Sequence, residues 1–248
     1  MTRSIDLNCD LGEGCPNDAE LMQYISSVNI ACGMHAGDRT TMLSTVELAI
    51  EYQVTIGAHP GYPDRENFGR FALDLSEKEL FKTIEDQISE LREICDQKGV
   101  ILRHVKPHGA LYNRSAADPN TAALIAECIK EIDSGLILFG LSESYSIKEA
   151  ERIGLRTASE VFADRTYRSD RSLTPRSEPY ALIQDSHSAA EQALDLVKYG
   201  LVRSTDALML SVKAETICLH GDGPNAVEFA KTIRSALSNS GFAIKSFE

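Results

Sequence analysis

The sequence contains no run of lysine or arginine residues, and its 25 basic residues are outnumbered by 37 acidic ones, which gives a net charge of −12. A chain of this charge repels nucleic acid and anionic membrane surfaces. It also lacks an apolar stretch long enough to span a bilayer, and its first residues lack the apolar core of a secretory signal. We therefore expect a cytoplasmic protein that binds neither nucleic acid nor membranes.

CxxC pairs are absent as well, although the chain has six cysteines, most of them within apolar strand or helix patterns. This spacing is not typical of a disulfide framework or a structural zinc site, so we expect reduced thiols. Cys9 and Cys32 have polar neighbours in the sequence, so a reactive thiol is one alternative for these two residues. A free cysteine is more commonly a small buried apolar residue.

Several catalytic motifs are missing. The sequence has no GxxxxGK[ST] loop, no dinucleotide-type GxGxxG, no HExxH and no GxSxG elbow. A self-contained P-loop ATPase, a Rossmann dehydrogenase and a lipase-like serine hydrolase are therefore disfavoured. A mononuclear metal site built from one Asp and two His residues on different strands stays open, because such ligands need no local motif.

Short apolar or β-branched runs alternate with longer helical patterns, which is typical of βα units around a parallel sheet. No linker or low-complexity tract divides the chain, and 248 residues is a common length for one β/α barrel. We expect a single α/β domain over residues 1–248, a parallel, TIM-like β/α barrel. Its seven predicted strands are 4–10, 28–32, 54–58, 101–106, 135–140, 157–162 and 215–220.

Helical patterns fill the stretches between these strands. In the longest, an apolar stripe runs through the sequence, and Ser76 and Glu79 have the spacing of a capping box. Two connections, 60–75 and 164–183, are long and rich in arginine. They are substrate loops or lids on one interpretation and solvated surface loops on the other. The predicted helices are 18–26, 40–52, 76–98, 119–132, 143–153, 186–199 and 225–237.

The first strand places three polar side chains on one face. Asp6, Asn8 and Asp10 alternate with apolar residues, and strand residues alternate between faces. Polar groups inside a barrel must be hydrogen-bonded or solvated, because an unpaired buried carboxylate is too costly. Either the three residues form a polar plug, or Asp10, which is last in the strand, lies at a catalytic rim.

Polar residues and glycines recur at the ends of the later strands. His35, His59, His108 and His220 all follow or end predicted strands, and the carboxyl ends of barrel strands are where active sites lie. We expect these four histidines to lie at one rim, and the remaining two, His104 and His187, to be structural. The segment 221–225 opens a helix whose free N–H groups could hold an anion, or it is an ordinary loop.

Six segments in the same order resemble the LamB/YcsF family, which supplies the A subunit of bacterial 5-oxoprolinase. They are DLNCDLGEG at 6–14, NIACGMHAGD at 29–38, GAHPGYPD at 57–64, VKPHGALYN at 105–113, EVFADR at 160–165 and HGD at 220–222. The likeness covers nearly the whole chain. Arg39 stands where the family usually has proline, and Tyr180 where glycine is common. The family fold is a seven-stranded β/α barrel related to glycoside hydrolases and polysaccharide deacetylases.

The resemblance implies ATP-dependent hydrolysis of the lactam of 5-oxo-L-proline to L-glutamate, together with separate B and C subunits and with Mg²⁺ accompanying ATP. On this reading Asp10 or Glu13 is the base, and Lys106 and Arg165 bind phosphoryl oxygens. The rim histidines His35, His59, His108 and His220 position substrate or carry protons. The expected substrate contacts are Asn8, Asn29, Tyr112, Glu160, Asp164, Arg165, His220 and Asp222.

Two alternatives stay open. One is a metal-dependent deacetylase or amidase on the same architecture, with Asp10, His35 and His59 as the metal ligands. It predicts an activity that needs no ATP and is lost on chelation. The other is a non-catalytic subunit that presents 5-oxoproline to its partners, in which case changes at the rim weaken substrate binding alone.

Overall fold

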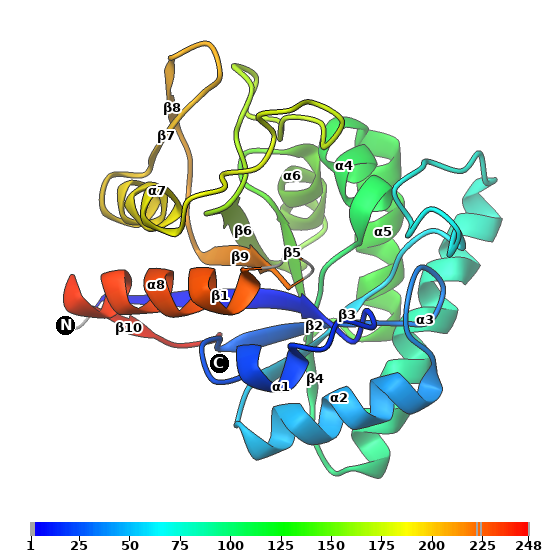
Figure 1. Cartoon of the computed structure of the whole chain (residues 1–248). Coiled ribbons are helices and arrows are strands. Elements are labelled where there is room, and N and C mark those ends of the chain that lie inside the picture. Colours follow the sequence, from blue (N-terminus) through cyan, green and yellow to red (C-terminus); the bar gives the residue numbers. More distant parts are fainter. Residues whose placement is uncertain (1–2, 222, 224, 248) are drawn as a thin grey trace.

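Seven parallel strands close into a barrel in the computed structural model, which describes residues 3–221, 223 and 225–247 (Figure 1). Closure follows from the pairing of β1 with β2 on one side and with β9 on the other, and β6 also pairs with β9. The prediction of a seven-stranded parallel barrel is confirmed. The barrel strands are β1 (Arg3–Leu11), β2 (Ser27–Ala31), β3 (Thr55–His59), β4 (Leu102–Val105), β5 (Ile137–Leu141), β6 (Arg156–Phe162) and β9 (Thr216–His220).

Helices surround the barrel on the outside (Figure 1). The first, α1, is much shorter than the predicted 18–26, and α4 was not predicted at all. Residues 107–109, Pro-His-Gly, carry no helix-start pattern, yet Gly109 adopts a φ of +51° and is the first residue of that helix. The helices are α1 (Asp18–Leu21), α2 (Arg39–Glu51), α3 (Glu77–Gln97), α4 (Gly109–Ala117), α5 (Pro119–Ile132), α6 (Tyr145–Arg152), α7 (Ser186–Tyr199) and α8 (Ala226–Asn239).

Three short strands lie outside the sequence prediction. β10 (Phe242–Ile244) pairs with the first residues of β1, and β7 (Leu201–Arg203) forms an antiparallel hairpin with β8 (Met209–Ser211). Each has only three residues, too few for an alternating pattern to stand out in a sequence. The hairpin projects away from the barrel (Figure 1).

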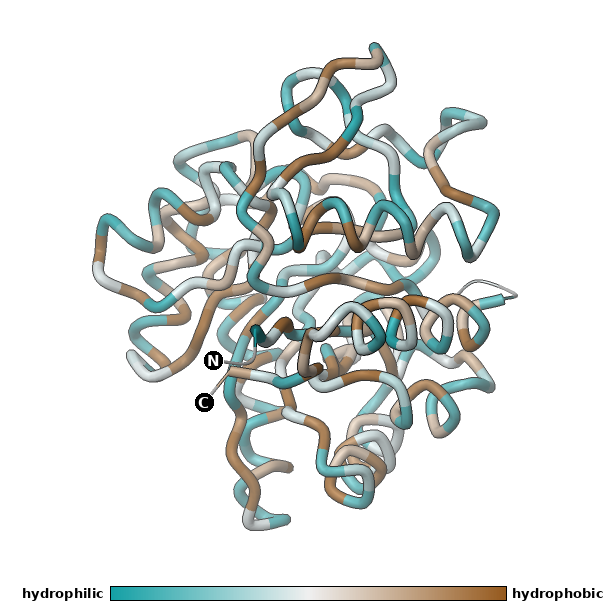
Figure 2. Tube along the Cα trace, turned by 90° about the vertical axis from the view of Figure 1, so that its left-hand side faces the viewer, coloured by the Kyte–Doolittle hydropathy of each residue, from teal (hydrophilic) through white to brown (hydrophobic). Residues whose placement is uncertain are grey.

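The main apolar core lies between the strands and the helices. On β1, Leu7 and Cys9 are fully buried against this layer. On α3 the predicted apolar stripe is buried, and the predicted capping box between Ser76 and Glu79 is present. Brown and teal segments alternate within single helices in Figure 2, as expected for helices with one buried face. Within the described ranges, no helix is both long and apolar enough to cross a bilayer.

The cysteines are free thiols, and all but Cys15 are buried. Burial raises the pKa of Cys9 well above its ordinary value and that of Cys32 to about 12. A thiol with a raised pKa is a poor nucleophile at neutral pH. Both residues therefore behave as the small buried apolar side chains that were the commoner alternative.

The lower part of the barrel interior is a satisfied polar network. Asp6 accepts hydrogen bonds from the hydroxyls of Ser26, Ser27 and Thr216, at 2.6–2.7 Å. Burial raises the pKa of Asp6 to about 6. The predicted alternation of side chains between the two faces of β1 is correct, and Asp6 belongs to the polar plug.

His104 is part of the same interior and is structural, as predicted. Its Nε2 lies 2.8 Å from Asn29 Oδ1, and its ring stacks on Phe139 at 4.1 Å. Gly57, on the adjacent strand, has no room for a side chain, because a Cβ atom there would overlap the His104 ring. The ring is buried and held from two sides, so it has little freedom to move.

Gly57→Ala should therefore lower the free energy of unfolding by about 3 kcal/mol, as overpacking in a rigid core does. Urea denaturation measures this change. In a His104→Ala background the added Cβ has space, so the further cost of Gly57→Ala should be at least about 1 kcal/mol smaller. Equal costs in the two backgrounds would show that the His104 ring is not what excludes a side chain at Gly57.

Candidate functional site

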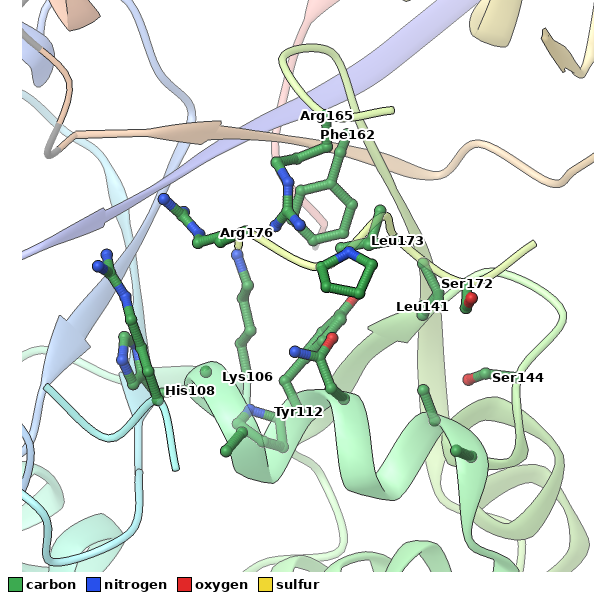
Figure 3. Close-up of a pocket in the computed structure, with 18 of the residues that line it drawn as sticks. Lys106, His108, Tyr112, Leu141, Ser144, Phe162, Arg165, Ser172, Leu173 and Arg176 are labelled. Carbon is green, nitrogen blue, oxygen red and sulfur yellow. The ribbon is translucent and has the colours of Figure 1, made fainter. Parts of the chain in front are cut away.

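A cleft of about 800 Å³ opens at the carboxyl ends of the barrel strands. Its floor is formed by residues that end or follow strands, among them Asp10, His59, Lys106 and His220. The walls come from the loop after β3, from α4, from the start of α6 and from the loop 164–183. In Figure 3, Lys106 extends toward the arginines of that last loop. The cleft therefore lies where barrel active sites are found.

Lys106 occupies the centre of the floor and is 2% exposed. Its Nζ lies 2.9 Å from Asp10 Oδ1 and 2.9 Å from Glu160 Oε1. It also donates to Asn8 Oδ1 at 3.2 Å and contacts Cys218 Sγ at 3.0 Å. These partners come from β1, β6 and β9, so one ammonium group joins three strands across the barrel.

The charges of this cluster hold one another in the ionised form. Burial alone would lower the pKa of Lys106, but the carboxylates of Asp10 and Glu160 raise it well above its ordinary value. Burial alone would raise the pKa of Asp10, but His59 and Lys106 lower it well below its usual range. At neutral pH the floor therefore presents an ammonium beside a carboxylate.

Three histidines and one carboxylate gather beside Asp10. His59 Nε2 lies 2.9 Å from His108 Nδ1, and Glu13 Oε1 lies 3.3 Å from His108 Nδ1 and from His35 Nε2. The rings of His35 and His108 stack at 3.7 Å. Burial lowers the pKa of His108 to about 3 and that of His35 still further. The prediction that these histidines meet at one rim is confirmed.

The fourth rim histidine, His220, is oriented by a carboxylate. Its Nδ1 lies 2.7 Å from Asp164 Oδ2, and its ring stacks against Phe162. Burial alone would raise the pKa of Asp164, but His220 lowers it, so Asp164 is an ionised acceptor. The proton of the His220 ring then lies on Nδ1, which leaves Nε2 to act as a base. Residue 220 lines the cleft.

The loop 164–183 covers the cleft and brings cations to it. Arg165 donates from Nε and Nη2 to the backbone carbonyls of Ala181 and Thr174, so part of its guanidinium holds the loop itself. Arg176 of the same loop also lines the cleft (Figure 3). Arg171 lines it too, and Arg70 joins them from the loop after β3. In a chain of net charge −12, this concentration of positive charge marks a place for an anion.

The structure separates the predicted site residues into two layers. Eight line the cleft, and five lie beneath or behind it. Asp222 is outside the described residues, as is part of the predicted anion loop 221–225. The lining residues are Asp10, Glu13, His59, Lys106, His108, Tyr112, Arg165 and His220, and the others are Asn8, Asn29, His35, Glu160 and Asp164.

The inner layer supports the residues that face the cleft. Asn29 donates to Asp10 Oδ1 at 2.7 Å, and Asn8 donates to Glu160 Oε1 at 2.9 Å. Burial and the neighbouring Glu160 carboxylate raise the pKa of Tyr112, which therefore keeps its hydroxyl proton. That Asn8, Asn29 and Glu160 contact substrate stays a prediction, because all three are fully buried below the floor.

Sequence reasoning missed several contributors. Cys218 touches Lys106 and shares the inward face of β9 with Thr216 and His220, so strand parity could have found it. Phe162 also lines the cleft, and the Lys106 ammonium lies 5.5 Å from its ring centroid. Arg176 belongs to the arginine-rich connection 164–183 and lines the cleft. Its place in the wall depends on how the loop folds back, and no local pattern encodes that.

Lys106→Met should lower the free energy of unfolding by about 3–5 kcal/mol, because it leaves two buried carboxylates without their cation. Chemical denaturation measures the loss. Lys82→Met is the matched control, since Lys82 forms an exposed ion pair with Asp86 on α3 and its loss should change stability little. Equal effects of the two substitutions would contradict the central role of the Lys106 ammonium.

Comparison with known proteins agrees over nearly the full length. Residues 5–248 match the LamB/YcsF family. A protein of Erwinia tasmaniensis, named as the A subunit of 5-oxoprolinase, is 49% identical over 242 residues, which cover 98% of this chain and 99% of that protein. A protein of the same name from Bacillus subtilis is 48% identical over 245 residues, which cover 97% and 95%.

Solved structures give the same picture. The crystal structure of the lactam utilization protein from Thermus thermophilus matches with a TM-score of 0.92 at 39% identity and covers 98% of this chain and 100% of that one. A family 4 carbohydrate esterase from Streptomyces lividans matches with a TM-score of 0.54 at 10% identity, covering 99% and 93% of the two chains. The second likeness concerns the fold alone.

Proposed function

The chain belongs to the LamB/YcsF family, and we propose that it is the lactam-binding component of an enzyme that hydrolyses 5-oxo-L-proline to L-glutamate with ATP. The names of its full-length relatives support this assignment. The single structural observation that carries it is the cleft above Lys106, which joins an ionised carboxylate, an oriented histidine and several arginines.

The chemical problem is a stable five-membered amide. In the proposed route the lactam oxygen attacks the γ-phosphorus of ATP, and ADP leaves. A water molecule then attacks the activated carbon, and the C–N bond breaks as the nitrogen takes up a proton, which gives γ-glutamyl phosphate. A second water molecule releases phosphate. The products of 5-oxoproline, ATP and the two waters are therefore glutamate, ADP and phosphate.

The cleft offers groups for each part of this route. The phosphoryl group carries negative charge, which the arginines of the covering loop and Lys106 would stabilise. Both residues expected to do this already have partners: the Lys106 ammonium contacts Asp10 and Glu160, and Arg165 donates to two loop carbonyls, so each acts on the phosphoryl group chiefly through its charge. The carboxylate of 5-oxoproline is a second anion for the same cations to bind.

Proton transfer falls to His220 and Asp10. His220 Nε2 is the better base, because Asp164 fixes the proton on Nδ1 and would stabilise the imidazolium that forms. The pKa of Asp10 is lowered, so Asp10 remains a carboxylate. Its role is chiefly to orient water or the N–H of the substrate's lactam ring and to hold the Lys106 ammonium in place. Glu13 is committed to the histidine cluster beside it.

We further propose that the chain works with B and C subunits and shares ATP with them. The absence of a P-loop motif from the sequence supports a site completed by a partner. Phe71 and Tyr145 line the cleft while 62% and 44% exposed, so an apolar rim is open to a partner. Magnesium is expected with ATP, bound through its phosphates.

Glutamate formation from 5-oxoproline tests the proposal directly. The chain alone, and the chain mixed with its B and C partners, are assayed with and without ATP. We expect glutamate only in the mixture with ATP. Absence of glutamate in a mixture whose subunits are shown to associate would contradict the assigned substrate. Chelator-sensitive amide or acetyl hydrolysis without ATP would favour the deacetylase alternative.

Asp10→Asn should reduce the rate of glutamate formation by at least about 100-fold, a loss typical of a residue that acts in the chemical step. The fold should be retained, because an amide fits the same space and can still accept from Lys106. Asp96→Asn, at the exposed end of α3, is the matched control. A normal rate for Asp10→Asn would remove this residue from the mechanism, and a loss confined to substrate affinity would favour the non-catalytic alternative.

A further inference from the structure

The protons of two site histidines are fixed by backbone carbonyls. His59 Nδ1 lies 2.7 Å from the carbonyl oxygen of Lys106, and His108 Nε2 lies 2.8 Å from that of Phe68. A carbonyl oxygen only accepts hydrogen bonds, so each of these nitrogens carries the ring proton. In the neutral rings the remaining nitrogens, His59 Nε2 and His108 Nδ1, therefore carry lone pairs.

These two lone-pair nitrogens face each other at 2.9 Å. When both rings are neutral, neither nitrogen has a proton to donate, so the contact is then not a hydrogen bond. Asp10 Oδ2 also lies 3.4 Å from His59 Nε2. Glu13 Oε1 joins them, at 3.3 Å from His108 Nδ1 and 3.9 Å from His59 Nε2. Electron-pair donors thus converge in a buried place, an arrangement that is stable only with a positive charge among them, either an added ring proton or a metal ion.

We propose that Glu13, His59 and His108 form a binding site for one divalent transition-metal ion of the Zn²⁺ class. Imidazole nitrogens with one carboxylate oxygen are a donor set that such ions prefer. Metal-bound histidines commonly donate their other N–H to a backbone carbonyl, and both histidines do so here. All three ligands line the cleft, which leaves a coordination position open on that side.

The spacing of the donors suits a small ion. Bonds of about 2.0–2.1 Å in a tetrahedral site place neighbouring donors about 3.3–3.4 Å apart. The three donor separations here, 2.9, 3.3 and 3.9 Å, fall around that value. Only small movements of the side chains are needed to equalise them.

The surroundings hold the donors in place. His35 stacks on His108 and lies 3.3 Å from Glu13 Oε1, so it positions the carboxylate from behind. Its Nδ1 is buried with no hydrogen-bond partner among the described residues. Gly61 and Gly69 allow the loop after β3 to close over this stack, since a Cβ at either position would come within 3 Å of His35. A rigid first layer favours metal binding.

A neighbouring group of residues is a poorer site. Asp10, Cys218 and His220 also lie close enough together to hold an ion. Lys106 Nζ already contacts Asp10 at 2.9 Å and Cys218 at 3.0 Å, so a second cation there would be repelled. The ligand set expected from sequence was Asp10, His35 and His59. The geometry instead brings Glu13 and His108 together with His59. Asp10 Oδ1 is held by Lys106, and its Oδ2 lies beside the site, 3.4 Å from His59 Nε2.

Zinc binding to the purified chain tests this inference without substrate, ATP or partner subunits, so its result is independent of the proposed reaction. Chelator-treated protein is titrated with Zn²⁺ by calorimetry, and metal content after dialysis is measured by mass spectrometry. We expect one equivalent per chain. With Co²⁺ in place of Zn²⁺, the absorption spectrum should show the intense d–d bands of a four-coordinate site.

His59→Ala, His108→Ala and Glu13→Gln should each weaken Zn²⁺ binding by more than about 100-fold. Changes to residues that only support the ligands cost up to about 100-fold, and removal of a ligand should cost more. His187→Ala, an exposed histidine at the start of α7, should bind as the wild type does. Circular dichroism checks that the variants fold. Lack of saturable binding by the wild type would overturn the inference, and this measurement needs no variant. Zn²⁺ binding of unchanged affinity in each of the three variants would also overturn the inference.

Discussion

The buried ammonium of Lys106 is the constraint on which the rest of the site depends. An isolated charge in a barrel interior is too costly to retain, so the residues around it must supply opposite charge and acceptors. Asp10 and Glu160 supply the charge, and Asn8 supplies a further acceptor. Lys106 therefore requires the polar side chains of Asn8 and Asp10 on the inward face of β1. Through these contacts and the one with Glu160, the lysine links strands that are far apart in the sequence.

This arrangement also separates support from reaction. Below Lys106, the network of Asp6, Asn8 and Asn29 fills the barrel and fixes the carboxylate of Asp10. Above it, the loops after the strands bring histidines and arginines over the same point. The strands provide a rigid base, and the strand ends and the loops after them supply the side chains of the cleft, as is usual in β/α barrels.

The sequence predicts the barrel and its rim well because both follow local rules. Alternation in β1 placed Asp6, Asn8 and Asp10 on the inner face, and glycine-flanked histidines at strand ends predicted a cluster at the rim. Local rules fail for α4, where a Pro-His-Gly segment enters a helix at once through the positive φ of Gly109. Local rules also do not predict which ring nitrogen of a histidine carries the proton. In His59 this depends on a contact of Nδ1 with the backbone carbonyl of Lys106.

A structure of the assembled enzyme with 5-oxoproline would test most directly whether the lactam is opened in this cleft. We predict that the ring lies above the Lys106 and Asp10 pair, within reach of His220, and that its carboxylate meets the arginines of the loop 164–183. A ring bound wholly on another protein of the assembly, with this cleft empty of substrate, would contradict that prediction.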